Sequence, residues 1–115
     1  MQAFDVLGNP VRRRILELIA EGTHSSGTIV EVIQREFDIS QPAVSQHLRV
    51  LRETGFATVR VDGPRRMYDV AAVPPLGEID AWLDRFRQLW AQRLDALATE
   101  VARGKRERRT RRRST

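Results

Sequence analysis

The sequence predicts a mainly α-helical fold with one small β-hairpin. Apolar residues recur at helical spacing in three stretches before residue 55, and a longer stripe of the same kind runs from Ile79 to Val101. Between them, the turn sequence Asp62-Gly63-Pro64 joins two stretches of strand-forming residues. Spacings of three and four residues are typical of helices that bury one face, and an Asp-Gly turn is typical of a hairpin. We expect one folded domain over residues 1–102 and a separate tail over residues 103–115.

The first long helix is expected to begin after Asn9 and to end near Gly22. Asparagine is a favoured N-cap, and proline, here Pro10, is favoured at the first helical position. Its inward residues are predicted to be Val11, Ile15, Leu18 and Ile19. Phe4 and Leu7 precede this helix and are candidates for a short helix of their own.

The next two helices are expected to form a helix-turn-helix. The loop THSSG leads into a helix from about Thr28 to Glu36, and a turn at Asp38-Ile39 separates it from a helix capped by Ser40 and ended by Gly55. So short a turn between two helices is the defining feature of this motif. The hairpin that follows at once has its tip at DGPRR and is expected to form a wing, so the fold class is a winged helix-turn-helix.

The last helix is expected to run from about Leu76 to Ala102 and to mediate dimerisation. Its apolar stripe covers about seven turns, which is more than a small domain can bury by itself. A second copy of the chain is the simplest partner that would bury this stripe. The candidate interface residues are Phe4, Leu7, Ile79, Trp82, Leu83, Phe86, Trp90, Leu94 and Leu97. Alternatively, Trp82, Phe86 and Trp90 of this helix would line a small-molecule pocket at that interface.

Positive charge is concentrated at the C-terminus. The net charge is +5, but residues 103–115 carry 8 basic residues and 1 acidic residue, so residues 1–102 have a net charge of −2. The tail has no apolar periodicity and is expected to be disordered when free. It is either an electrostatic arm for DNA or a solvated appendage.

The third helix, from Ser40 to Gly55, carries the strongest functional signal. Val44, Leu48 and Leu51 are predicted to face inward. Glutamine and arginine can each form paired hydrogen bonds with base edges, and serine can bond to a base or a phosphate. The candidate DNA-binding residues of this helix are Ser40, Gln41, Pro42, Ser45, Gln46, His47, Arg49 and Arg52. The alternative is an exposed polar face without a ligand.

Other basic residues have both a functional and a purely structural interpretation. The wing candidates are Arg60, Asp62, Gly63, Arg65 and Arg66. The hairpin tip with Arg65 and Arg66 is expected to reach a minor groove or its phosphates, unless the turn is merely solvated. Arg60 lies on a strand, and the sequence leaves open which face it occupies. Arg12, Arg13 and Arg14 would contact phosphate, or form salt bridges to Glu17 or a neighbouring chain. For His47, contact with DNA and packing near the turn remain equally open, and His24 is expected on the surface of a loop.

Several functional classes are not supported by the sequence. Cysteine is absent and there are 2 histidines, so we expect no metal site, no cofactor and no thiol chemistry. No phosphate-binding glycine loop, nucleophile elbow or zinc-protease motif is present, so we do not expect an enzyme. No apolar run approaches a membrane span and no signal peptide is visible, so we expect a cytoplasmic protein without membrane contact.

Three segments together resemble the ArsR (ArsR/SmtB) family of bacterial winged helix-turn-helix repressors. They are FDVLGNPVRRRILELI, SQPAVSQHLRVLRETG and VRVDGPRRMYDV, and the likeness runs from about Phe4 to Val70. The resemblance implies a homodimer, built from the first and last helices, that binds an imperfect palindrome in an operator. It maps the DNA-contacting residues of the recognition helix onto Gln41, Pro42, Ser45, Gln46 and His47, and the wing tip onto Asp62–Arg66.

The chain departs from the metal-sensing members of that family. The stretch Ser45–Leu51 has no cysteine, and the last helix has Asp80, Asp84 and Glu100 but no histidine. The resemblance is therefore to the metal-independent branch, whose effector would be an unidentified small molecule or protein. We expect a sequence-specific, homodimeric transcriptional repressor that binds double-stranded DNA. The alternatives are a non-specific architectural DNA-binding protein acting through its tail, and a protein-interaction module.

Overall fold

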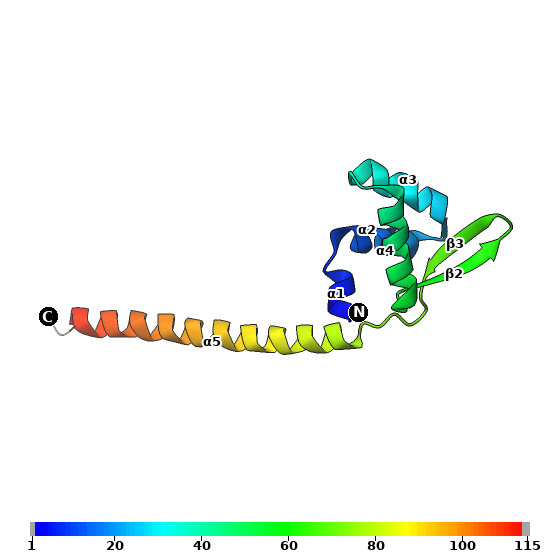
Figure 1. The fold of residues 1–115 in the computed structure, drawn as a ribbon. Helices are drawn as coiled ribbons and strands as arrows, with labels where there is room; N and C mark the ends of the chain where they lie inside the picture. The colour runs from blue at the N-terminus through cyan, green and yellow to red at the C-terminus, as the bar shows by residue number, and fades with distance from the viewer. Residues whose placement is uncertain (1, 114–115) are drawn as a thin grey trace. The chain divides into compact units, whose positions relative to one another are not determined.

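The computed structural model describes residues 2–113, and within them it is mainly α-helical with one small sheet (Figure 1). The elements are α1 (Ala3–Leu7), α2 (Pro10–Glu21), β1 (His24–Ser25), α3 (Ser26–Glu36), α4 (Gln41–Glu53), β2 (Ala57–Asp62), β3 (Arg65–Val70) and α5 (Gly77–Arg113). The chain divides into two compact units between Glu78 and Ile79. The first unit holds the winged helix-turn-helix, and the second is the long helix.

The helix starts follow the predicted capping residues. The Asn9 side chain accepts hydrogen bonds from the backbone N–H groups of Val11 and Arg12, at 2.9 and 3.2 Å. The Ser40 hydroxyl accepts from the Ala43 N–H at 3.3 Å and begins α4. The predicted start of α3 was wrong: the helix begins at Ser26 rather than at Thr28. Its N-cap is Ser25, whose hydroxyl accepts a hydrogen bond from the Thr28 N–H.

The sheet has one strand that the sequence did not predict. The strand order is β1-β3-β2, and both pairings are antiparallel. The predicted loop THSSG therefore contains β1, in which His24 pairs with Tyr68 of β3. His24 is half-buried rather than a surface loop residue. Two residues are too few to show the alternation of apolar and polar side chains that is typical of a strand. β1 therefore depends on its pairing with β3.

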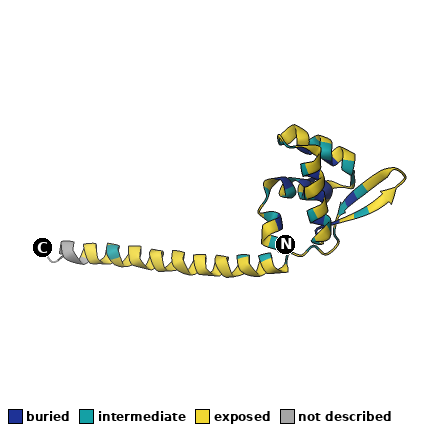
Figure 2. Ribbon diagram, viewed as in Figure 1, coloured by how far each residue is buried: buried dark blue, intermediate teal, exposed yellow. Residues whose placement is uncertain are grey.

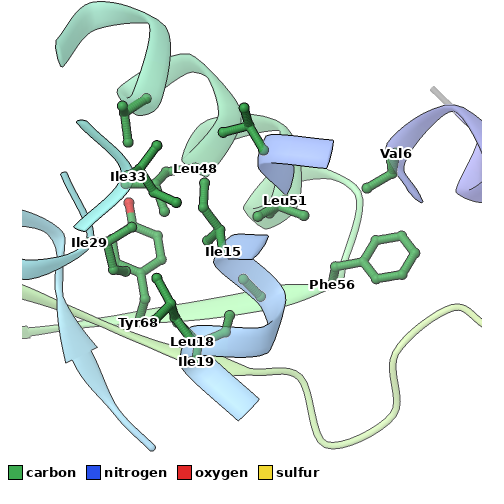
Figure 3. Packing of buried hydrophobic residues seen from close by; sticks show 13 residues of the cluster. Val6, Ile15, Leu18, Ile19, Ile29, Ile33, Leu48, Leu51, Phe56 and Tyr68 are labelled. Atoms are coloured by element: carbon green, nitrogen blue, oxygen red, sulfur yellow. The ribbon is translucent and has the colours of Figure 1, made fainter. Parts of the chain in front are cut away.

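The core of the first unit joins the helices to the sheet (Figure 3). The inward residues predicted for α2 and α4 are all buried, and Ile15, Val44 and Leu51 have no exposed surface. The buried cluster comprises Val6, Val11, Ile15, Leu18, Ile19, Ile29, Ile33, Val44, Leu48, Leu51, Phe56, Ala57 and Tyr68. Burial of these side chains fixes α4 and the hairpin on one scaffold, which positions both candidate DNA-binding elements.

A glycine turn connects α4 to the wing. Gly55 has φ of +84°, a left-handed conformation that L-residues with a side chain rarely adopt. The Phe56 N–H donates to the Leu51 carbonyl at 2.9 Å, and the Gly55 N–H donates to the Arg52 carbonyl at 3.2 Å. This hydrogen-bond pair is a Schellman motif. Because Leu51 and Phe56 are both buried, the motif sets the direction in which β2 leaves the helix.

The long helix α5 differs from the prediction at its C-terminal end. The sequence predicted an end near Ala102 and a disordered tail, but the structure continues the helix to Arg113. Residues 114–115 lie outside the described part. Arginine, lysine and glutamate are good helix formers, and a single glycine, Gly104, costs only about 1 kcal/mol. Basic residues are also favoured near a helix C-terminus by the helix dipole.

Candidate nucleic-acid interface

The outward face of α4 is exposed and polar. Gln41, Pro42, Ser45, Gln46 and Arg49 are exposed, whereas the opposite face lies in the core. Within the described residues, Gln41, Ser45 and Gln46 form no side-chain hydrogen bond or ion pair, so their polar atoms are open to a ligand. This division of the helix matches the sequence-based prediction.

The turn before α4 is held by three hydrogen bonds. The Phe37 N–H donates to the Ile33 carbonyl at 2.8 Å, and the Ile39 N–H donates to the Phe37 carbonyl at 2.9 Å. The Gln34 amide donates to the Ile39 carbonyl at 3.4 Å. These hydrogen bonds satisfy backbone N–H and carbonyl groups at the end of α3 and in the turn that joins it to α4. They also fix α4 relative to α3.

The wing presents its arginines on two different faces. In the antiparallel register, Asp62 lies opposite Arg65, Arg60 opposite Met67, and Val61 opposite Arg66. Since neighbouring strand residues face opposite sides of a sheet, Arg60 and Arg65 share one side and Arg66 lies on the other. That other side also carries Tyr68, which is buried against the helices. Gly63, with φ of +60°, forms the exposed two-residue tip with Pro64.

The arginines at the start of α2 have structural partners within the chain. Arg14 forms a two-pronged ion pair with Glu36 of α3, at 2.7 and 3.0 Å, and a longer one with Glu17 at 3.3 Å. The Arg12 guanidinium donates to the carbonyls of Val6 and Asp5, at 2.9 and 2.8 Å. Arg13 donates to the Leu7 carbonyl at 2.7 Å. Arg12 and Arg13 therefore satisfy the C-terminal carbonyls of α1.

His47 is half-buried and lies against Arg12. Its Nδ1 atom is 3.3 Å from Nη1 of Arg12. An arginine guanidinium only donates, so Nδ1 accepts and the ring proton is on Nε2. Burial, and secondarily the positive charge of Arg12, lower the pKa of His47 below the usual histidine value. Both predicted roles of His47 therefore involve the neutral imidazole, and the packing role is the one with a partner in this chain.

Arg49 and Arg52 follow Gln46 along α4. Arg49 is exposed and forms an ion pair with Glu53 at 2.9 Å. That pairing raises the pKa of Arg49 and lowers the pKa of Glu53. Arg52 is half-buried and has no ion pair within the described residues. Because Glu53 partly neutralises Arg49, Arg52 is the arginine of this pair that would attract an anion more strongly.

Most of α5 is exposed in the single chain (Figure 2), and so are most of the residues predicted at the dimer interface. Trp82, Phe86 and Trp90 have exposed fractions of 44%, 49% and 56%, and their rings stack along α5 with centroid distances of 5.3 and 6.4 Å. Leu94, Leu97 and Phe4 are also exposed, whereas Leu7, Ile79 and Leu83 are half-buried. The stripe on α5 is therefore a large apolar surface in an isolated chain.

The described part of the chain holds neither a metal-ligand cluster nor a membrane span. Among residues 2–113, no three His, Cys, Asp or Glu side chains are grouped so that they would hold a metal ion. None of the helices described is both long enough and apolar enough to cross a membrane.

Comparisons with known proteins agree with this geometry. A family model described as a helix-turn-helix domain matches residues 7–60. The chain is 34% identical over 97 residues to the HTH-type transcriptional regulator Rv2034 of Mycobacterium tuberculosis, covering 84% of this chain and 83% of that protein. It is 38% identical over 50 residues to the transcriptional repressor SdpR of Bacillus subtilis, covering 44% of this chain and 51% of that protein.

A solved structure has the same architecture. It is the homodimeric winged helix-turn-helix DNA-binding domain of Mb0332 from Mycobacterium bovis, a possible ArsR-family transcriptional regulator. The TM-score is 0.51 at 27% sequence identity, and the match covers 76% of this chain and 73% of that one. The likeness thus extends beyond the helix-turn-helix itself.

Proposed function

Because the chain belongs to the ArsR/SmtB family of winged helix-turn-helix transcriptional regulators, we propose that it is a homodimeric repressor of a palindromic operator. Binding to DNA and regulation of transcription come with the family. The proposal concerns the oligomeric state, the operator and the sign of regulation. As a regulator of chromosomal operators, it would act in the cytoplasm.

The observation that carries the proposal is the outward face of α4. Gln41, Ser45 and Gln46 project from a helix whose other face is buried, and they have no partner within the described chain. Glutamine pairs with adenine through two hydrogen bonds, and the N-terminal part of a recognition helix makes most base contacts. Base-specific binding by these three residues is therefore the role that best fits their exposure.

Dimerisation is supported by the apolar stripe of α5. Trp82, Phe86, Trp90, Leu94 and Leu97 each expose between 44% and 56% of their surface in the single chain. Contiguous apolar surface of this extent usually marks a protein interface. A dimer would place two copies of α4 in successive major grooves, about 34–36 Å apart. The structural neighbour from M. bovis is homodimeric, which supports a dimer here.

A metal-independent mode of control fits the residues that are present. The chain has no cysteine, and no metal-ligand group occurs among residues 2–113. We propose that an unidentified small molecule or protein, rather than a metal ion, controls release from DNA.

The test is fluorescence anisotropy with DNA from upstream of the protein's own gene and with a scrambled duplex of the same length. We expect tight binding to the native duplex alone, and a loss of about 1–3 kcal/mol for Gln46→Ala on that duplex only. Gln88→Ala, on exposed α5, is the matched control. Equal binding of both duplexes, followed by failure to select a preferred sequence from random duplexes, would refute operator recognition.

One observation favours a second candidate, a non-specific DNA-binding protein. Residues 103–115 carry a net charge of +7, and α5 continues through them to Arg113. Phosphate binding adds affinity without sequence preference. Replacing the 8 basic residues by glutamine, which also forms helices, should weaken binding to both duplexes equally. Loss of all DNA binding in this variant would favour the second candidate over the first.

A further inference from the structure

An apolar hollow lies where α1, α2 and the base of the hairpin meet. Its volume is about 280 Å³, and all of its lining belongs to the first unit. We propose that this hollow binds a small apolar molecule that carries one amino group. Only the assignment of that molecule as the effector rests on the proposed function. The lining residues are Leu7, Leu16, Glu17, Ala20, Phe56, Val70, Pro74 and Leu76.

The lining is drawn from separate segments of a packed scaffold. Leu7 ends α1, and α2 contributes three residues of its exposed and half-buried side. Phe56 follows α4 and is only 2% exposed, so it closes the inner side of the hollow. Val70 ends β3, and Pro74 and Leu76 belong to the segment that leads to α5. The hollow is thus formed by tertiary packing and not by one loop.

The size and the lining suit a small apolar ligand. Ligand pockets usually have volumes of about 300–1,000 Å³, so this hollow is at the lower end of that range and fits a molecule of one or two rings. Seven of the eight lining residues are apolar. Removal of the ligand's apolar surface from water would therefore supply most of the binding free energy.

Glu17 gives the hollow a negative charge. Arg14 is shared between two carboxylates, with bonds of 2.7 and 3.0 Å to Glu36 and a longer contact of 3.3 Å to Oε2 of Glu17. One arginine between two carboxylates leaves one excess negative charge. Oε1 of Glu17 forms no hydrogen bond within the described residues, and the side chain is 64% exposed. A protonated amino group at the outer edge of the hollow would pair with this oxygen and stay partly hydrated.

A second copy of the chain is a less suitable occupant of the hollow. Of the residues predicted at the dimer interface, Leu7 is the one that borders it. The large apolar stripe proposed to bind a partner lies on α5, in the second unit. We therefore assign the stripe to the partner and the hollow to a ligand.

The hollow is connected to both candidate DNA-binding elements through Phe56. The Phe56 N–H donates to the Leu51 carbonyl of α4, and the Phe56 carbonyl accepts from the Ala71 N–H after β3, both at 2.9 Å. A molecule that touches Phe56 and Val70 therefore touches the junction at which the hairpin leaves α4. A ligand that fits this junction better in the free protein than in the DNA complex would favour release from DNA.

Three probes of similar shape and different charge test the ligand class. They are 1-naphthylmethylamine, 1-naphthylmethanol and 1-naphthoate, titrated into the full-length protein and followed by NMR of side-chain methyl groups. We expect the amine to bind about two- to fivefold more tightly than the alcohol, as is typical of one exposed ion pair, and the naphthoate to bind most weakly. The shifts should centre on Leu7, Leu16 and Val70. Shifts confined to α5, no shift at millimolar amine, or naphthoate binding as tight as that of the amine would overturn the proposal.

Two variants test the lining with matched controls. Ala20→Met should reduce the affinity for the amine and the alcohol by about tenfold, because the added side chain occupies the hollow. Ala81→Met, on an exposed part of α5, is its control. Glu17→Gln should remove the preference for the amine over the alcohol, whereas Glu31→Gln, on an exposed part of α3, should not. Unchanged probe binding in both Ala20→Met and Glu17→Gln would exclude this hollow as the site.

Operator binding separates the site from its role as an effector site. By thermodynamic linkage, the amine must weaken operator binding by the factor by which operator weakens binding of the amine, and we expect about tenfold. Ala20→Met should abolish this effect and leave operator binding itself unchanged. If the protein prefers no DNA sequence, the proposed function fails, yet the amine must still bind the free protein. Binding of the amine without any effect on operator affinity would refute the effector role.

Discussion

Replacing Arg12 by leucine removes a side chain that connects α1, α2 and α4. Arg12 belongs to the first turn of α2, donates to the carbonyls of Val6 and Asp5 in α1, and contacts His47 in α4. We expect this substitution to destabilise the fold and to raise the pKa of His47, because the positive charge that opposes protonation of the imidazole is removed.

The size of the effect follows from the exposure of the bonds. The bond to the Val6 carbonyl is partly buried, and a charge-assisted bond of this kind contributes about 1.5 kcal/mol. The bond to the Asp5 carbonyl is exposed and contributes about 0.5 kcal/mol. The expected destabilisation is thus about 2 kcal/mol. Arg13→Leu is the matched control, since it removes only the exposed bond to Leu7 and should cost about 0.5 kcal/mol.

Two measurements on each variant test the prediction. Urea unfolding at a fixed protein concentration should show the midpoint of Arg12→Leu lowered by roughly 1 M, given the slopes typical of small proteins. An NMR titration of the His47 ring should show its pKa raised in Arg12→Leu but unchanged in Arg13→Leu. Equal unfolding midpoints for the two variants, or an unchanged His47 pKa in Arg12→Leu, would refute the role assigned to Arg12.

Three further predictions concern dimerisation, the wing turn and pH. Trp90→Asp should give monomers or insoluble protein in sedimentation experiments, whereas Gln88→Asp should not; an intact Trp90→Asp dimer would exclude this stripe as the interface. Gly55→Ala should cost about 1 kcal/mol in unfolding free energy, since its φ of +84° strains an alanine although no atom lies within 4 Å of the added Cβ; an unchanged urea midpoint would contradict this. The lowered pKa of His47 means that the unfolded chain binds a proton more readily. Unfolding free energy should therefore be fully retained above the ordinary histidine pKa of about 6.5 and fall as the pH drops below it. His47→Gln should remove this dependence below pH 6.5; the same pH profile in the variant would show that another group is responsible.

The helices of the first unit were predictable because their periodicity is strong and their caps are local. Asn9, Ser40 and Gly55 mark helix ends by chemistry that involves only neighbouring residues. The inward residues of α2 and α4 were identified correctly for the same reason. The shape of this unit is therefore encoded largely in short segments of sequence.

Apart from the start of α3 and the end of α5, the errors arose where a residue depends on a partner distant in the sequence. β1 requires a place beside β3, and Arg12 and Arg14 also have partners on other helices, although the predicted salt bridge of Arg14 to Glu17 within α2 is present. In the candidate site, the sequence identified the arginines but not their separation onto two faces of the wing. The burial of Tyr68 against the helices was not predicted either, since its position follows from tertiary packing. The end of α5 was misplaced because a high density of charge was given more weight than helix propensity.

The separation of the two faces of α4 has an evolutionary consequence. Val44, Leu48 and Leu51 are buried in the core of the first unit, whereas the side chains of Gln41 and Gln46 form no hydrogen bond or ion pair within the described chain. On the proposal that Gln41, Ser45 and Gln46 contact bases, a duplicated gene would acquire a new target through a few outward substitutions that leave the buried face intact. On the same proposal, Gln41, Ser45 and Gln46 are the first positions that a designer would exchange to give this scaffold a new target.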